Sequence, residues 1–157
     1  MIFSTKEDIE APIDAVFKAV SNFDAFEHSA LRRGAKVQRV NRKTHPSTSL
    51  AWDVRFTFRG KKRDMLIELI EHDAPNRLLA QSQSGGIEGG LQMNLVALSS
   101  NRTRLLIETE IKPKTLSARL MVQSMRLAKN KLTRRYRLKV ADFANDIEDR
   151  YKCGRLG

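Results

Sequence analysis

The sequence predicts an α+β domain, in which a curved antiparallel sheet of about seven strands is followed by one long C-terminal helix. Two observations lead to this prediction. Apolar and polar residues alternate with a period near two from residue 35 to residue 112, which is typical of half-buried strands. From residue 115 to residue 152, apolar residues recur instead at spacings of three and four, which places them on one face of a helix. The predicted order is one strand, two short helices, six strands and the long helix.

The N-terminal part predicts the first strand and the two short helices. Phe3, Thr5 and Ile9 share one face of the strand. After Pro12, which suits a helix start, apolar residues follow at the spacing of one helical face, namely Ile13, Val16, Phe17 and Val20. Asp24 with Glu27 resembles a capping box for the second helix, which Gly34 can end in a left-handed conformation.

The remaining strands are separated by polar turns. The clearest strand has apolar residues on one face and mainly charged residues on the other, the apolar ones being Leu50, Trp52, Val54, Phe56 and Phe58. A polar loop at residues 41–49 precedes it, and a hairpin turn at residues 60–62 follows it. We interpret the glycine-rich residues 85–90 as a turn or bulge, because they lack the Gly-Lys-Ser/Thr ending of a phosphate loop.

Length and composition favour one globular domain over residues 1–157. A chain of 157 residues can bury a sizeable core, and 41% hydrophobic with 30% charged residues is an ordinary globular composition. The longest apolar runs are far shorter than a transmembrane helix, and the acidic N-terminal residues are unlike a signal peptide. We therefore expect no transmembrane segment and a cytoplasmic location. The single cysteine, Cys153, has no partner for an internal disulfide.

Catalytic, metal and cofactor sites are not predicted. His28, His45 and His72 lie on different predicted elements without the close spacing of zinc ligands. There is no G-x-S-x-G turn and no other nucleophile motif.

The order of elements, the phrase Ala11-Pro12-Ile13-Asp14-Ala15-Val16-Phe17 and the glycine-rich segment together resemble the START-like superfamily. This superfamily, also called SRPBCC or polyketide cyclase-like, has the helix-grip fold. The resemblance covers about residues 2–151. It implies that the sheet wraps around the C-terminal helix and that the space between them accepts an apolar ligand.

The candidate ligand-binding residues are those whose phase on strand or helix directs them toward this space. They are Trp52, Val54, Phe56, Met65, Ile67, Gln81, Gln83, Met93, Leu95, Ile107, Met121 and Met125. The aromatic and methionine residues suit a filled core as well as an adaptable apolar site. The phase of Gln81 and Gln83 is ambiguous, because Leu79 shares their face. An inward glutamine would need a hydrogen-bond partner in the protein, in water or in the ligand.

The charge is strongly basic and uneven. The net charge is +11 with a pI near 10.2, and the stretch from Lys112 to Lys139 holds ten basic residues and no acid. Residues 115–152 as one helix would span about 57 Å, more than a domain whose radius of gyration is about 15 Å, so the helix must overhang, bend or break. Either this face is simply solvated, or it binds RNA, a ribosome or another anionic surface. The candidates for the second alternative are Arg126, Lys129, Arg134, Arg137 and Lys139.

Three functions follow, in order of preference. The first is binding of a small hydrophobic molecule such as a lipid, quinone or polyketide-like compound between sheet and helix. The second is an interaction protein that uses the basic helix. The third is an enzyme of the cyclase or hydratase type, which requires an acid or base inside the pocket.

Overall fold

The structure is a computed structural model that describes residues 1–45 and 48–154, with side chains outside residues 41–49. The strands are β1 (Ile2–Ile9), β2 (Lys36–His45), β3 (Thr48–Phe58), β4 (Lys61–Asp73), β5 (Arg77–Ser84), β6 (Ile87–Ser99) and β7 (Arg102–Pro113). The helices are α1 (Ile13–Val20), α2 (Phe23–Arg32), α3 (Leu116–Leu127) and α4 (Lys129–Lys152). The predicted fold class is confirmed.

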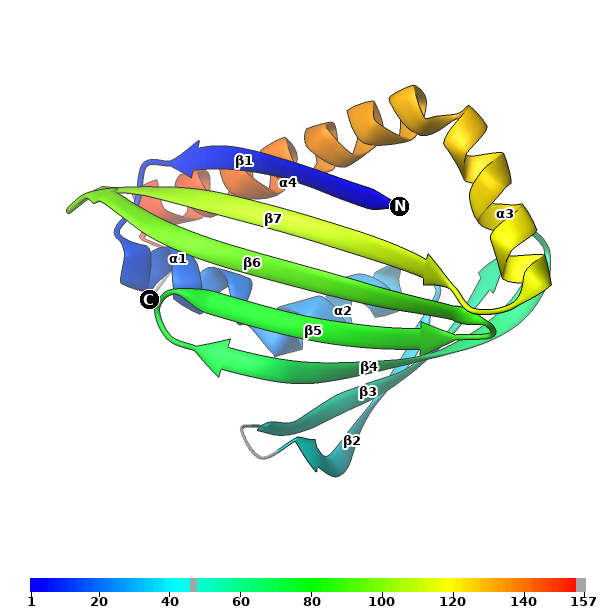
Figure 1. Ribbon diagram of the computed structural model, residues 1–157. Coiled ribbons are helices and arrows are strands. Elements are labelled where there is room, and N and C mark those ends of the chain that lie inside the picture. The colour runs from blue at the N-terminus through cyan, green and yellow to red at the C-terminus, as the bar shows by residue number, and fades with distance from the viewer. Residues whose placement is uncertain (46–47, 155–157) are drawn as a thin grey trace.

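All seven strands form one antiparallel sheet in the order β1-β7-β6-β5-β4-β3-β2. The first strand therefore pairs with the last, and Phe3 lies opposite Thr109. Helices α1 and α2, which connect β1 to β2, lie against one face of the curved sheet (Figure 1). Helix α4 packs along β1 and contacts α1.

The core lies between this inner face of the sheet and the helices. Alternate residues of the strands point into it, as the period of two predicts. Ile9 on β1, Val16 on α1 and Leu105 on β7 are fully buried there, and Val140 and Ala144 cover them from α4. Apolar burial of this kind is the main stabilising term of the fold.

The predicted C-terminal helix is divided into two. Ala128 has φ −106° and ψ 20°, outside the helical region, so α3 ends at Leu127 and α4 starts at Lys129. The two helices meet at a corner (Figure 1). A single straight helix would overshoot the sheet, whereas the break lets α3 cover the end of β7 and α4 return along β1.

Two turn predictions need correction. The predicted capping box is wrong, because Asn22 caps α2 by accepting a hydrogen bond from the amide of Ala25 at 3.1 Å, which leaves Glu27 for another role. The predicted loop at residues 41–49 is also too long, since β2 continues to His45 and β3 begins at Thr48; Pro46 and Ser47 lie outside the described residues.

The β5–β6 turn holds the start of α3. Gly85 and Gly86 both have positive φ, which confirms the predicted turn, while Gly89 and Gly90 are part of β6. The amide of Lys114 donates to the carbonyl of Gly86 at 2.7 Å. A Cβ on Gly86 would collide with the side chain of Thr115, the residue that caps α3. This close approach fixes the position of the first turn of α3.

Candidate ligand site between the sheet and the helices

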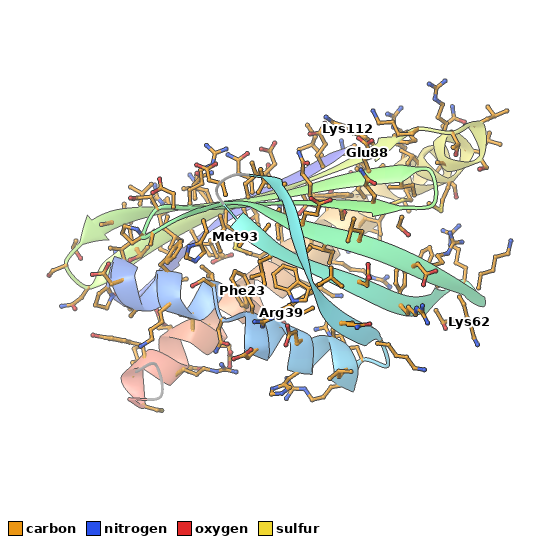
Figure 2. The ribbon with its side chains drawn as sticks, turned by 90° about the horizontal axis from the view of Figure 1, so that it is seen from below. Phe23, Arg39, Lys62, Glu88, Met93 and Lys112 are labelled. Atoms are coloured by element: carbon orange, nitrogen blue, oxygen red, sulfur yellow. The ribbon has the colours of Figure 1, made fainter. Side chains whose placement is uncertain are left out.

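The predicted inward residues of the strands form one connected apolar cluster. Trp52, Val54, Leu95 and Ile107 are buried in it, and Phe56, Met65, Ile67 and Met93 pack against it while half-buried. Figure 2 places Phe23 of α2 and Met93 of β6 on the side of the sheet that the helices cover. The positions of the strand residues in this cluster agree with the phase that the sequence predicts for them.

Three small residues, Ala80, Ser82 and Gly89, lie in the middle of the inner face. Ile67 pairs with Ser82, and Ser82 pairs with Gly89. At the next inward-facing position of each strand, two residues further along, Leu69 pairs with Ala80, and Ala80 pairs with Leu91. These small residues leave the neighbouring Ile67, Leu91 and Met93 half-buried although they lie on the covered side of the sheet. We call this region, formed by Phe56, Met65, Ile67, Ala80, Ser82, Leu91 and Met93, the inner surface.

Gln81 and Gln83 are not directed to the inner surface, although Gln83 also lines the depression described below. Gln81 pairs with Glu68 and Gly90, and Gln83 pairs with Leu66 and Glu88, all on the outer face. Both glutamines are exposed. The phase of β5 is set by Leu78, which is buried, and not by Leu79, so the residues at odd numbers point outward.

Met121 and Met125 lie apart from the other candidates. Both are half-buried on the face of α3 that also carries the buried Ala118 and Val122. This face contacts β7, not the central cluster of the described core. The break at Ala128 explains the difference, because it turns α3 away from the line of α4.

An open depression of about 870 Å³ reaches the core near the start of α3. Val37, Val54 and Met65 line it and also belong to the apolar cluster. Its rim holds the β5–β6 turn, with Gly86 and Ile87, and polar residues that include Asp53, Arg55, Asp64, Glu88 and Lys114. An apolar floor with a charged rim is a suitable entrance for a molecule that leaves water.

One polar pair joins the first half of α4 to β7. The hydroxyl groups of Thr109 and Tyr136 are 3.0 Å apart, and the ring of Tyr136 lies 5.6 Å from that of Phe3. Burial raises the pKa of Tyr136 above its ordinary value, and its neutral hydroxyl can donate a hydrogen bond. The sequence places Tyr136 on the apolar stripe of the helix but gives no signal for its contact with Thr109.

A second polar cluster orients Trp52. Its indole Nε1 donates to Oε1 of Glu27 at 2.9 Å, and Nε of Arg39 donates to the same oxygen at 2.7 Å. The hydrogen bond from Trp52, and then that from Arg39, lowers the pKa of Glu27. Rings of Phe23 and Phe26 lie 5.2 and 5.6 Å from that of Trp52. Glu27 therefore ties α2 to β3 and keeps the indole in one orientation.

We expect Glu27→Gln to lower the free energy of unfolding by about 1 kcal/mol at neutral pH, because two charge-assisted hydrogen bonds become neutral or are lost. A carboxyl whose pKa is lower in the folded state stabilises the fold above its unfolded-state pKa, and that contribution is lost as pH falls through the folded-state pKa. The difference in free energy of unfolding between wild type and Glu27→Gln should therefore become smaller when urea unfolding is repeated at acidic pH.

Asp24→Asn is the matched control. Asp24 pairs with the same Arg39 at 3.0 Å, but its side chain is 81% exposed, compared with 24% for Glu27. Exposed ion pairs contribute little, so this variant should change stability by less than about 0.5 kcal/mol. An equal loss in both variants, unaffected by pH, would contradict the role given to Glu27.

The three histidines lie on different elements, as the sequence predicts. His28 is exposed on α2, and the ring of His72 near the end of β4 lies 5.2 Å from that of Phe17. His45 is the last residue of β2, and its side chain is not among those described. Within residues 1–40 and 50–154, no three His, Cys, Asp or Glu side chains are grouped to hold a metal ion. Cys153 is exposed after the end of α4.

The candidate residues of the basic surface are all exposed, as predicted: Arg126, Lys129, Arg134, Arg137 and Lys139. They extend from the end of α3 along the first half of α4. Arg137 also lines a depression of about 610 Å³ beside β1 and β7, together with Thr5 and Glu108. None of the helices among the described residues has the length and apolar content needed to cross a membrane.

Comparison with known proteins found likeness in structure alone. No protein-family model matches the chain, and no curated protein matches its sequence. A point mutant of norcoclaurine synthase from Thalictrum flavum, solved with a transition-state analogue, is similar with a TM-score of 0.66 and 14% identity, over 97% of this chain and 96% of that one.

Two bacterial structures are also similar. The Zhui aromatase/cyclase from Streptomyces sp. R1128 has a TM-score of 0.65 and 10% identity, over 96% of this chain and 95% of that one. A START superfamily protein from Mycobacterium smegmatis has a TM-score of 0.55 and 12% identity, over 85% of this chain and 95% of that one. The strand order, the position of the helices and these likenesses together show that this chain has the START-like, helix-grip fold.

Proposed function

We propose that the protein binds a small hydrophobic molecule, such as a lipid, quinone or polyketide-like compound, against the inner surface. The observation that carries the proposal is the half-buried state of Ile67, Leu91 and Met93 on the covered side of the sheet. A filled core would bury these side chains, because protein interiors pack at the density of organic crystals. An apolar ligand would complete their burial.

The expected binding energy is consistent with a specific ligand. Apolar burial contributes about 25 cal/mol per Å², so about 300 Å² of ligand surface would supply about 7.5 kcal/mol before the cost of immobilisation. The hydroxyl of Tyr136, beside Thr109, would orient a polar end of the ligand. The depression with Val54 and Met65 on its floor would be the entrance.

Binding is preferred to catalysis of the cyclase or hydratase type. A catalytic acid or base must be free to exchange a proton with the substrate. Glu27, the carboxylate nearest to Trp52, already accepts hydrogen bonds from both Trp52 and Arg39. The hydroxyl of Tyr136 already contacts that of Thr109, and its raised pKa disfavours the ionised form that a base would need.

Titration with Nile red tests the proposal. This solvatochromic dye is uncharged, so the basic surface of the protein has no electrostatic attraction for it. We expect a saturable blue shift of its emission with about one dye per protein. An absence of any shift up to the solubility limit of the dye would contradict an accessible apolar site.

A further inference from the structure

Helix α3 exposes a row of leucines that the described part of the chain does not cover. Leu116, Leu120 and Leu127 are 75%, 60% and 92% exposed. At about 100° per residue they lie on one face of α3, opposite the buried Ala118 and Val122. A helix that buries one apolar face and exposes another has a second surface to dock on.

Basic residues border this leucine row. Arg119 and Arg126 lie along one side of it, and Lys129 and Lys131 follow at the corner between α3 and α4. All four are exposed, and none forms an ion pair with a described residue. Lys112 and Lys114, by contrast, lie near Glu110 and Glu88 at 3.8 and 3.6 Å. No described acidic residue therefore compensates the charge beside the leucines.

We propose that α3 docks the protein on an anionic lipid bilayer. Leu116, Leu120 and Leu127 would enter the boundary between headgroups and acyl chains, and the bordering cations would contact lipid phosphates. Helix α3 has 12 residues and is about 18 Å long, so it can lie flat on the surface over its whole length.

RNA fits the same observations less well. RNA phosphates would bind the cations, but they offer no apolar environment for the three leucines. Tyr136 is the one aromatic residue in the basic stretch from residue 112 to residue 139. Its hydroxyl lies beside Thr109, so its ring is not presented for base stacking.

The fold presents α3 in a fixed position. The helix begins at the cap Thr115, which packs against Gly86, and its opposite face is held by the buried Ala118 and Val122. The depression near Gly86 and Lys114 adjoins the start of α3. Docking would bring this depression, the proposed ligand entrance, close to the bilayer. The docking itself does not depend on whether a ligand binds against the inner surface.

Sedimentation with vesicles tests the docking. The lipids are phosphatidylcholine alone, or phosphatidylcholine with about 30% phosphatidylserine. We expect binding to the anionic vesicles that weakens with salt. Leu120→Ser with Leu127→Ser, and separately Arg126→Glu with Lys129→Glu, should each weaken binding by about tenfold or more.

Leu98→Ser and Lys139→Glu are the matched controls. Leu98 is exposed at the far end of β6, and Lys139 lies about 15 Å along α4 from Lys129. Each control should change binding by about twofold or less. The substituted residues are all exposed, so circular dichroism should show every variant folded.

A fluorescent label gives a second readout. Cys153 is the single cysteine, so Leu127→Cys in a Cys153→Ser background places one environment-sensitive dye at the corner. Its emission should shift to the blue with anionic vesicles. The proposal is overturned if the leucine variant binds vesicles like wild type, if neutral and anionic vesicles bind equally, or if single-stranded RNA binds while vesicles do not.

Discussion

Replacing Leu105 by alanine should lower the free energy of unfolding by about 2–5 kcal/mol, the largest stability effect we expect from one substitution in this chain. Leu105 is 0% exposed on β7, where it pairs with Leu95 of β6 inside the apolar cluster. Alanine there removes buried apolar atoms and leaves a cavity. Urea unfolding followed by circular dichroism measures the loss.

Leu106→Ala is the control for this experiment. Leu106 is the next residue on β7, points to the outer face and is 36% exposed, so we expect a loss of about 1 kcal/mol or less. Equal losses for the two variants would mean that the inner and outer faces of β7 are not assigned correctly.

Replacing Met93 by tryptophan should weaken Nile red binding by about tenfold or more. Met93 is half-buried on the inner surface, and the indole would occupy the space in which we propose the ligand lies. Gln92→Trp is the control, because Gln92 is the adjacent residue on β6 and points to the outer face. Fluorescence titration of the two variants and wild type gives the comparison.

Stability of the Met93 variant separates an open space from a filled core. A larger side chain in a filled core costs about 1–3 kcal/mol, whereas in an open space it costs little. We expect Met93→Trp to fold with nearly the stability of wild type and to lose the dye. Strong destabilisation with dye binding retained would contradict the proposed site.

Strand positions were largely predictable from sequence, because each strand has one buried face. Trp52, Val54 and Phe56 alternate with Asp53 and Arg55, and this pattern alone determines which side chains are directed inward. The pattern fails on β5, where apolar residues occur at both Leu78 and Leu79. The phase there depends on pairing with β4 and β6, which a single strand does not reveal.

The helix break and the polar contacts were not predictable in the same way. Ala128 is a good helix former, and neither glycine nor proline marks the end of α3. The length of the helix alone indicated that it must overhang, bend or break. The contacts of Glu27 with Trp52 and of Tyr136 with Thr109 join residues about 25 positions apart in sequence. Such pairs arise from tertiary packing, for which local spacing gives no signal.

Native mass spectrometry of the protein purified from its own host tests most directly whether the inner surface holds a ligand. We expect a population heavier than the 17.9 kDa polypeptide by the mass of one small apolar molecule, and we expect this population to disappear in Met93→Trp and to persist in Gln92→Trp. A single population at the polypeptide mass, from protein that also fails to bind Nile red, would contradict the account.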